Sequence, residues 1–156
     1  AGTLETIDLS RNTLLRLPRD LFERLTELKL LILRQNMMTS IPPAVFMCKS
    51  SLTNLDLTSN KLSTDALECL GELEILAFLN LTSNLIARLP ESFAKLQKLK
   101  VLLLSTNFVR QIDPVVFELK QLKELDLSFN MIEEVPDGIA GLENLQCLVL
   151  TGNSIT

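Results

Sequence analysis

The 156-residue sequence contains no histidine, tyrosine or tryptophan. Histidine is the commonest general base in enzymes. Without it, several types of metal site and all Ser-His or Cys-His nucleophilic pairs are also excluded. Glycine is also scarce, with five residues, and none of them belongs to a Gly-rich loop of the kind that cradles a phosphate group. We therefore predict that the chain is not an enzyme and has no catalytic residues, no metal site and no cofactor.

Basic residues are too few to create a positive field. Lysine and arginine together number 15 against 19 aspartates and glutamates, with a formal net charge of −4, and the two signs are interspersed. A nucleic-acid ligand requires many cations to neutralise its phosphates, so we predict no nucleic-acid binding. Uninterrupted apolar runs of about 18 residues are also missing, so we predict no membrane insertion.

Cysteine occurs three times, at widely separated positions. An odd number at this spacing resembles neither a disulfide framework nor a C-x-x-C metal site, which favours a reducing, cytoplasmic location. The glycosylation sequon Asn80-Leu81-Thr82 leaves an extracellular location as the alternative. Cys48 and Cys69 fall near apolar repeat positions and are expected in the core, whereas Cys147 occupies an outward position and is expected to be an exposed thiol.

Leucine, by contrast, is abundant, with 36 residues, and it is periodic. The clearest copy of the pattern runs from Leu122 to Asn130 and reads Leu-x-x-Leu-x-Leu-x-x-Asn. Its asparagine recurs every 23 or 24 residues, at Asn12, Asn36, Asn60, Asn84, Asn107, Asn130 and Asn153. Such a period predicts a solenoid in which neighbouring repeats share one core.

The repeats begin near residues 4, 28, 52, 76, 99, 122 and 145, and together they form one solenoid over 1–156. The first residues already belong to a repeat, and Thr156 follows closely after the last asparagine. We therefore expect the chain to be a fragment of a longer protein.

Within each repeat, period-2 alternation predicts a short strand that leads into a turn. At that turn a buried asparagine amide is expected to satisfy backbone groups that have left the sheet. A proline then follows in most repeats, which favours an irregular return segment or a short helical turn. The return segments are expected to complete the core with Leu21, Phe22, Leu25, Val45, Phe46, Phe93, Leu96, Val116, Phe117, Leu119, Ile139 and Leu142.

The third repeat differs because residues 62–73 contain no proline. Asp65 and Glu68 have the spacing of a capping box, and Ala66, Leu67 and Leu70 follow helical periodicity. This return segment is therefore predicted to be a true helix and the most helical of the set.

Seven in-register copies of the Leu-x-x-Leu-x-Leu-x-x-Asn pattern resemble the leucine-rich repeat family over essentially the whole chain. The 23-residue copies, such as the segment 89–99, are similar to intracellular scaffolds of the Scribble and Ras-suppressor kind. The 24-residue copies with Leu21-Phe22 and Val45-Phe46 are similar to Toll-like and other extracellular receptors. The resemblance implies protein binding, with roles in scaffolding or signalling.

The same resemblance implies an α/β fold, a right-handed solenoid in the shape of a horseshoe arc. Its concave side would be a parallel β-sheet of about seven short strands. Its convex side would consist of loops and short 3-10 or α turns.

Alternation along the strands, with a spacing of about 4.8 Å between them, predicts rows of side chains across the concave sheet. One row reads Thr6, Leu30, Asn54, Phe78, Val101, Glu124 and Cys147, and the next reads Asp8, Ile32, Asp56, Asn80, Leu103, Asp126 and Val149. A further row directly after the asparagines contains Met37, Leu85, Phe108 and Met131 and extends the apolar character onto the ascending edge.

Apolar side chains with interleaved acids are typical of a protein-contact surface. We predict that a protein or peptide partner binds the concave sheet and the ascending edge through Phe78, Val101, Leu103, Glu124, Asp126, Phe129, Val149 and Phe108. The alternative is a structural spacer or scaffold segment within a large assembly or a receptor ectodomain. Its contacts would lie at the edges or ends of the solenoid and not on the concave face. Other domains of the same longer chain are a further candidate partner and would cover the apolar residues.

Overall fold

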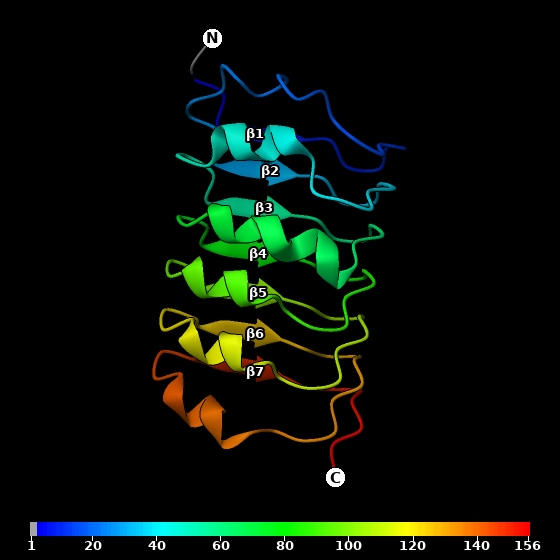
Figure 1. The fold of residues 1–156 in the computed structure, drawn as a ribbon, viewed down its shortest axis with the longest axis vertical. Helices are drawn as coiled ribbons and strands as arrows, with labels where there is room; N and C mark the ends of the chain where they lie inside the picture. The colour runs from blue at the N-terminus through cyan, green and yellow to red at the C-terminus, as the bar shows by residue number, and fades with distance from the viewer. Residues whose placement is uncertain (1–2) are drawn as a thin grey trace.

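The computed structural model describes residues 3–156 as a single stack of short strands and turns (Figure 1). The strands are β1 (Thr6–Asp8), β2 (Leu30–Ile32), β3 (Asn54–Asp56), β4 (Phe78–Asn80), β5 (Val101–Leu103), β6 (Glu124–Asp126) and β7 (Cys147–Val149). They form one seven-stranded parallel sheet in sequence order. The predicted solenoid and its parallel sheet are confirmed.

The return segments lie in front of the sheet in Figure 1 and form the second layer. They contain the 3-10 helices η1 (Pro43–Cys48), η2 (Thr64–Glu72), η3 (Glu91–Lys95), η4 (Pro114–Glu118) and η5 (Asp137–Gly141). Between the two layers lies a continuous leucine core. The central strand residues Leu31, Leu55 and Leu79 are 0% exposed, and no repeat could bury such side chains without its neighbours.

The repeated asparagine joins each repeat to the one before it. The Nδ2 group of Asn107 donates to the carbonyl oxygens of Leu104, in its own repeat, and of Leu81, in the preceding repeat, both at 3.0 Å. Its Oδ1 accepts a hydrogen bond from the backbone N–H of Ile86 at 3.0 Å. The same pattern recurs at Asn36, Asn60, Asn84 and Asn130. The predicted internal ladder is confirmed.

The third return segment differs from its prediction in type. The helix η2 is the longest of the set, with nine residues, but it is a 3-10 helix, and its N-cap Ser63 makes no side-chain capping bond. The predictions of a true helix and of a capping box at Asp65 and Glu68 are therefore wrong. Both ends of the segment are closed by i→i+3 bonds, from Ala66 N–H to Ser63 O at 3.1 Å and from Leu73 N–H to Leu70 O at 3.0 Å, and such tight turns are the usual form of a connector between other elements.

The phenylalanines of the return segments are not all buried. Phe22 and Phe93 are 1% and 0% exposed, whereas Phe46 and Phe117 are only partly buried against the core. Leu21 is 46% exposed, contrary to its predicted core position. Residues 19–24 form turns instead of a helix, so Phe22 takes the core position of that repeat and Leu21 faces solvent.

Replacement of Asn107 by alanine should lower the free energy of unfolding by about 1–3 kcal/mol for each buried backbone group that loses its partner. Chemical denaturation with a two-state fit measures this change. Lys98→Ala, an exposed substitution in the same part of the chain, is the control and should change stability by less than about 0.5 kcal/mol. Equal stability of both variants would show that the ladder does not stabilise the fold.

Candidate functional site

The register of the sheet brings the predicted binding residues together. In the first row, Phe78, Val101, Glu124 and Cys147 are direct neighbours on four successive strands. In the second row Leu103 lies between Asn80 and Asp126, and Asp126 pairs with Val149. Both predicted rows are therefore present in the structure on four adjacent strands, β4 to β7.

Exposure separates the sheet residues from those beyond the strand ends. Phe78, Val101, Leu103 and Val149 are partly buried by their neighbours in the sheet. By contrast, Phe129 is 59% exposed. The sheet residues thus form a partly buried apolar surface, and the exposed Phe129 lies at its border.

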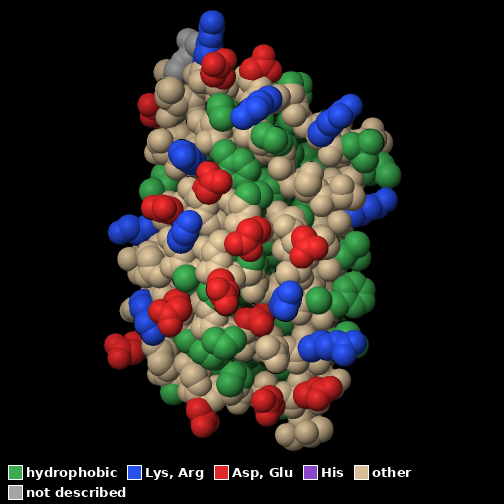
Figure 2. Space-filling view, viewed as in Figure 1, with side chains coloured by type: hydrophobic (Ala, Val, Ile, Leu, Met, Phe, Trp, Pro, Cys, Tyr) green, Lys and Arg blue, Asp and Glu red, His purple; other side chains and the backbone are tan. Residues whose placement is uncertain are grey.

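Phe108 belongs to the ascending edge and not to the sheet. It lies in one row with Leu85 and Met131. The exposed fraction is 51% for Leu85, 51% for Phe108 and 43% for Met131. Each backbone N–H in this row donates to a carbonyl of the preceding repeat, for example Phe108 to Ile86 at 2.8 Å. Figure 2 shows hydrophobic side chains along the right-hand edge, which is formed by the loops that follow the strand arrows in Figure 1.

Phe129 has an unusual backbone conformation. Its φ of +52° lies in the left-handed region, where the other repeats place Arg11, Gln35, Ser59, Ser83, Thr106 and Gly152. A left-handed conformation costs a residue with a side chain about 1–2 kcal/mol, and a bulky residue there is an outlier. The ring of Phe129 packs over Gly152 so closely that a Cβ on Gly152 would lie 2.6 Å from Phe129 Cδ1. The left-handed conformation is therefore a property of the repeat turn, and Phe129 differs from its equivalents in placing an exposed aromatic ring there.

The two acids of β6 differ in their bonding. Asp126 Oδ1 accepts hydrogen bonds from the backbone N–H and the hydroxyl of Ser128, at 2.9 and 2.6 Å. Within residues 3–156 the Glu124 carboxylate accepts no hydrogen bond and forms no salt bridge, since the one salt bridge found there joins Lys29 and Glu5. Asp126 therefore stabilises its own turn, whereas the carboxylate of Glu124 has no partner within residues 3–156.

The turn role of Asp126 is repeated elsewhere, and sequence reasoning missed it. Asp8, Asp56 and Asn80 each accept a hydrogen bond from the backbone N–H two residues later. At Asp8 the Ser10 hydroxyl and backbone N–H both stabilise the carboxylate and lower its pKa below the usual value. The signal was the recurring Asp/Asn-Leu-Ser/Thr sequence at the strand ends, a pattern of side-chain turns.

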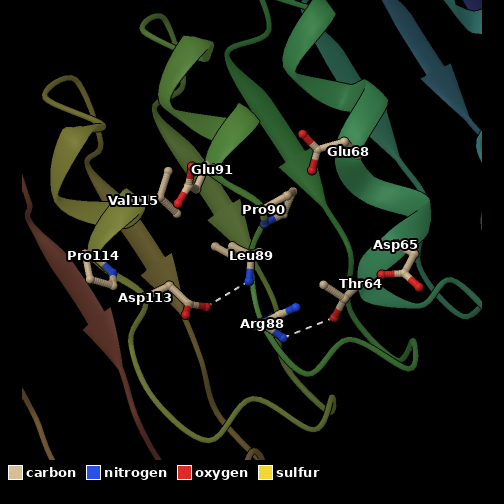
Figure 3. Close-up of a pocket in the computed structure, with 10 residues that line it drawn as sticks. All are labelled: Thr64, Asp65, Glu68, Arg88, Leu89, Pro90, Glu91, Asp113, Pro114 and Val115. Carbon is tan, nitrogen blue, oxygen red and sulfur yellow. Dashed lines mark hydrogen bonds between the residues drawn. The ribbon is translucent and has the colours of Figure 1, made fainter.

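A groove on the opposite side was also not predicted (Figure 3). It has a volume of about 500 Å³ and is lined by the starts of η2, η3 and η4, with Arg88 among the acids Asp65, Glu68, Glu91 and Asp113. Figure 2 shows acidic side chains scattered over this helical face.

Two polar groups of this groove already hold the backbone in place. Thr64 Oγ1 accepts hydrogen bonds from the N–H groups of Ala87 and Arg88, both at 3.2 Å, and Asp113 Oδ2 accepts one from Leu89 at 2.8 Å. Acids at the start of a helical turn also stabilise its free N–H groups. The groove is therefore explained as a structural feature of the return segments.

Residues 3–156 hold no group of three or more His, Cys, Asp or Glu that could bind a metal ion. None of the helices within that range has the length and apolar character needed to cross a membrane. The apolar rows with Glu124 and Phe129 thus form the arrangement best suited to an interaction, through contact area and charge.

Sequence comparison identifies the repeat. The profile of the family described as "Leucine rich repeat" matches residues 2–62, 50–108 and 97–155, and so covers nearly the whole chain. The zebrafish (Danio rerio) leucine-rich repeat and fibronectin type III domain-containing protein 1-like protein is 43% identical over 61 residues, which are 39% of this chain and 9% of that protein. The chain thus spans about a tenth of the length of this curated relative.

Solved structures share the whole fold. A leucine-rich repeat protein of Leptospira interrogans superimposes with a TM-score of 0.92 at 37% identity, covering 99% of this chain and 39% of that one. The plant peptide hormone receptor RGFR1 in complex with RGF2 gives 0.77 at 28% identity, with 97% and 25% covered. The complex of TLR13 with ssRNA13 gives 0.80 at 26% identity, with 97% and 23% covered.

The contact between Phe129 and Gly152 predicts a coupled effect on stability. Gly152→Ala should lower the free energy of unfolding by about 1–2 kcal/mol, because the new Cβ meets the ring and the residue loses the ease of glycine at positive φ. In a Phe129→Ala background the same substitution should be less destabilising, since only the backbone strain remains. A double-mutant cycle measures the difference, and a coupling of zero would refute the contact.

Proposed function

The chain belongs to the leucine-rich repeat family, and on that basis we propose that it is a non-enzymatic module that binds a protein or peptide. The binding surface comprises the concave sheet from β4 to β7 and the ascending edge. One observation carries this proposal, namely that Phe129 is both 59% exposed and held at a φ of +52°. The turn gives the equivalent residue of the other repeats the same left-handed φ, so the fold accounts for the conformation but not for an exposed aromatic ring at this position. Exposed aromatic anchors of this kind are typical of interface hot spots.

Three neighbouring features support the same surface. Phe78, Val101 and Leu103 lie on two adjacent strands, and the partial burial of these side chains limits their conformational freedom. Leu85, Phe108 and Met131 continue the apolar surface beyond the strand ends. A preordered surface of this kind loses little entropy when a partner binds.

A protein or peptide partner is favoured over a nucleic acid, although the similar TLR13 structure is a complex with ssRNA13. None of the outward-facing strand residues, at either position of β1 to β7, is a lysine or arginine. RNA binding requires cations that neutralise phosphates. The similar RGFR1 structure was solved with RGF2 and supports a peptide as the class of ligand.

The alternative proposal is a spacer within a larger assembly or a receptor ectodomain, whose contacts lie at the convex side or the ends. The chain spans 39% or less of each similar solved chain reported above. Other domains of the same protein are therefore candidate partners for the apolar surface. The two proposals differ in which lysines of this chain approach a neighbouring polypeptide.

Crosslinking mass spectrometry of the parent protein in its native extract tests the binding surface. Lys100 and Lys123 are exposed directly before β5 and β6, whereas Lys49 and Lys95 are exposed on the helical side. We expect links to another polypeptide from Lys100 and Lys123, and we expect Phe78→Asp or Phe129→Asp to reduce these links at least tenfold by placing a charge in an apolar contact.

Met47→Asp is the matched control, because Met47 is 47% exposed but lies in η1 on the helical side. It should leave the links unchanged. Thermal unfolding of all three variants verifies that each one folds. Links from Lys49 and Lys95 alone, unaffected by the phenylalanine variants, would reject the concave surface and support the spacer.

For location we propose a reducing compartment, with the cytoplasm as the first choice. The three cysteines are free thiols, with Cys48 buried, Cys69 partly buried and Cys147 exposed. Burial raises the pKa of the Cys48 and Cys69 thiols above the usual value, which lowers the fraction of reactive thiolate. The exposed thiol of Cys147 is therefore the best group to label in a test of the location.

Maleimide labelling of intact cells tests this location. A membrane-permeant maleimide should modify Cys147 and leave Cys48 unmodified, while an impermeant maleimide should modify neither. Labelling after denaturation confirms that both thiols are present. Modification of Cys147 by the impermeant reagent in intact cells would instead place the chain outside the cell.

A further inference from the structure

The outward positions of the strands carry charge of only one sign. The outward-facing strand residues include the carboxylates Asp8, Asp56, Glu124 and Asp126, and no cation. Lys100 and Lys123 immediately precede β5 and β6, yet neither forms a salt bridge with a carboxylate in the described chain. Besides the hydrogen bonds from Ser10, Arg34 lies close enough to Asp8 to lower the pKa of its carboxylate, so the negative charge without a nearby cation is concentrated toward β6, where a partner must supply the compensating charge.

Glu124 differs from the other three carboxylates. Asp8, Asp56 and Asp126 end their strands, and each accepts a hydrogen bond from the backbone of its own turn. Glu124 begins β6 and is partly buried, and it makes no such bond within residues 3–156. Its carboxylate is therefore available to a partner without any loss of internal hydrogen bonding.

Apolar side chains surround Glu124 on both sides. Val101 is its partner on β5 and Cys147 its partner on β7, and Leu103 and Val149 occupy the next row. A lysine or arginine side chain suits such a site, because its methylene stem packs on apolar groups while its charged head reaches the carboxylate. An acidic or purely apolar segment would leave Glu124 desolvated and unpaired, and a neutral donor would leave its charge uncompensated.

We infer that the partner of the concave face is a cationic peptide segment that places a lysine or arginine on Glu124 between Val101 and Cys147, with apolar residues on either side. This inference rests on the proposed function and specifies the chemistry of its partner. Asp126 contributes negative potential, but its Oδ1 stays bonded to Ser128. Phe78 and Phe129 provide the apolar anchors at the two ends of the site.

Selection from a displayed library of random twelve-residue peptides tests the inference. The 156-residue chain, Glu124→Gln and Glu124→Lys serve as parallel targets. Peptides selected by the unmodified chain should be enriched in lysine or arginine next to apolar residues. Glu124→Gln should lose the basic enrichment and keep the apolar one, and Glu124→Lys should select acidic residues at the same place.

A synthetic copy of the best peptide provides the quantitative measurement. Its Kd for Glu124→Gln should be about tenfold weaker than for the unmodified chain, between the effects of exposed and buried ion pairs. Added NaCl should weaken binding to the unmodified chain more than binding to Glu124→Gln. Glu143→Gln is the matched control, with the same loss of charge at an exposed residue outside the sheet, and should bind the peptide like the unmodified chain.

Each contrary outcome has a distinct meaning. Selected peptides that depend on Phe78 and Phe129 but contain no basic residue would refute the cationic partner and leave the proposed function intact. Peptides insensitive to Phe78→Asp, Phe129→Asp and Glu124→Gln, or failure to select any, would refute both. A dimer of the unmodified chain that Glu124→Gln dissociates would assign a second copy to this face and also refute the peptide. Unchanged thermal unfolding of Glu124→Gln establishes that its effect is on binding.

Discussion

The five internal repeats of this protein each depend on one buried amide, at Asn36, Asn60, Asn84, Asn107 and Asn130. The side chain of Asn107 and its equivalents satisfies carbonyl groups of two consecutive repeats and receives an N–H group from the preceding one. These bonds allow the chain to leave a three-residue strand and turn without unpaired backbone groups. The leucine core supplies most of the stabilisation, but the amides determine where each strand ends and thus keep all strands in one register.

Because the register is constant, residues that the core does not need form continuous rows across neighbouring repeats. A solenoid therefore separates the residues that build the fold from those available for binding. In the sixth repeat Leu125 and Leu127 are 0% and 2% exposed, whereas Glu124 and Phe129 lie on the outer surface. In the proposed function, differences between repeats at these outward positions, such as the acidic residue within an otherwise apolar group, would determine the specificity.

The strands, the rows and the amide ladder were predictable from the sequence, because they follow from two backbone properties, the alternation of side chains and the fixed period of the repeat. The bonding of Asp126 was not predicted, since it depends on the turn that Asp126 itself forms with Ser128. The helix type of η2 was missed because apolar periodicity over a short segment does not distinguish i→i+3 from i→i+4 bonding. The strained φ of Phe129 was missed for a similar reason, as a motif written in residue types contains no dihedral angles.

The packing of Phe129 over Gly152 has a consequence for the evolution of the protein. Leucine-rich repeats share an interchangeable backbone, so duplication or exchange of a single repeat should be neutral for the fold. Here, however, a residue of the sixth repeat requires a glycine in the seventh. The smallest unit that can be inherited together with this surface is therefore a pair of adjacent repeats, and recombination between the two would separate the aromatic residue from the space it occupies.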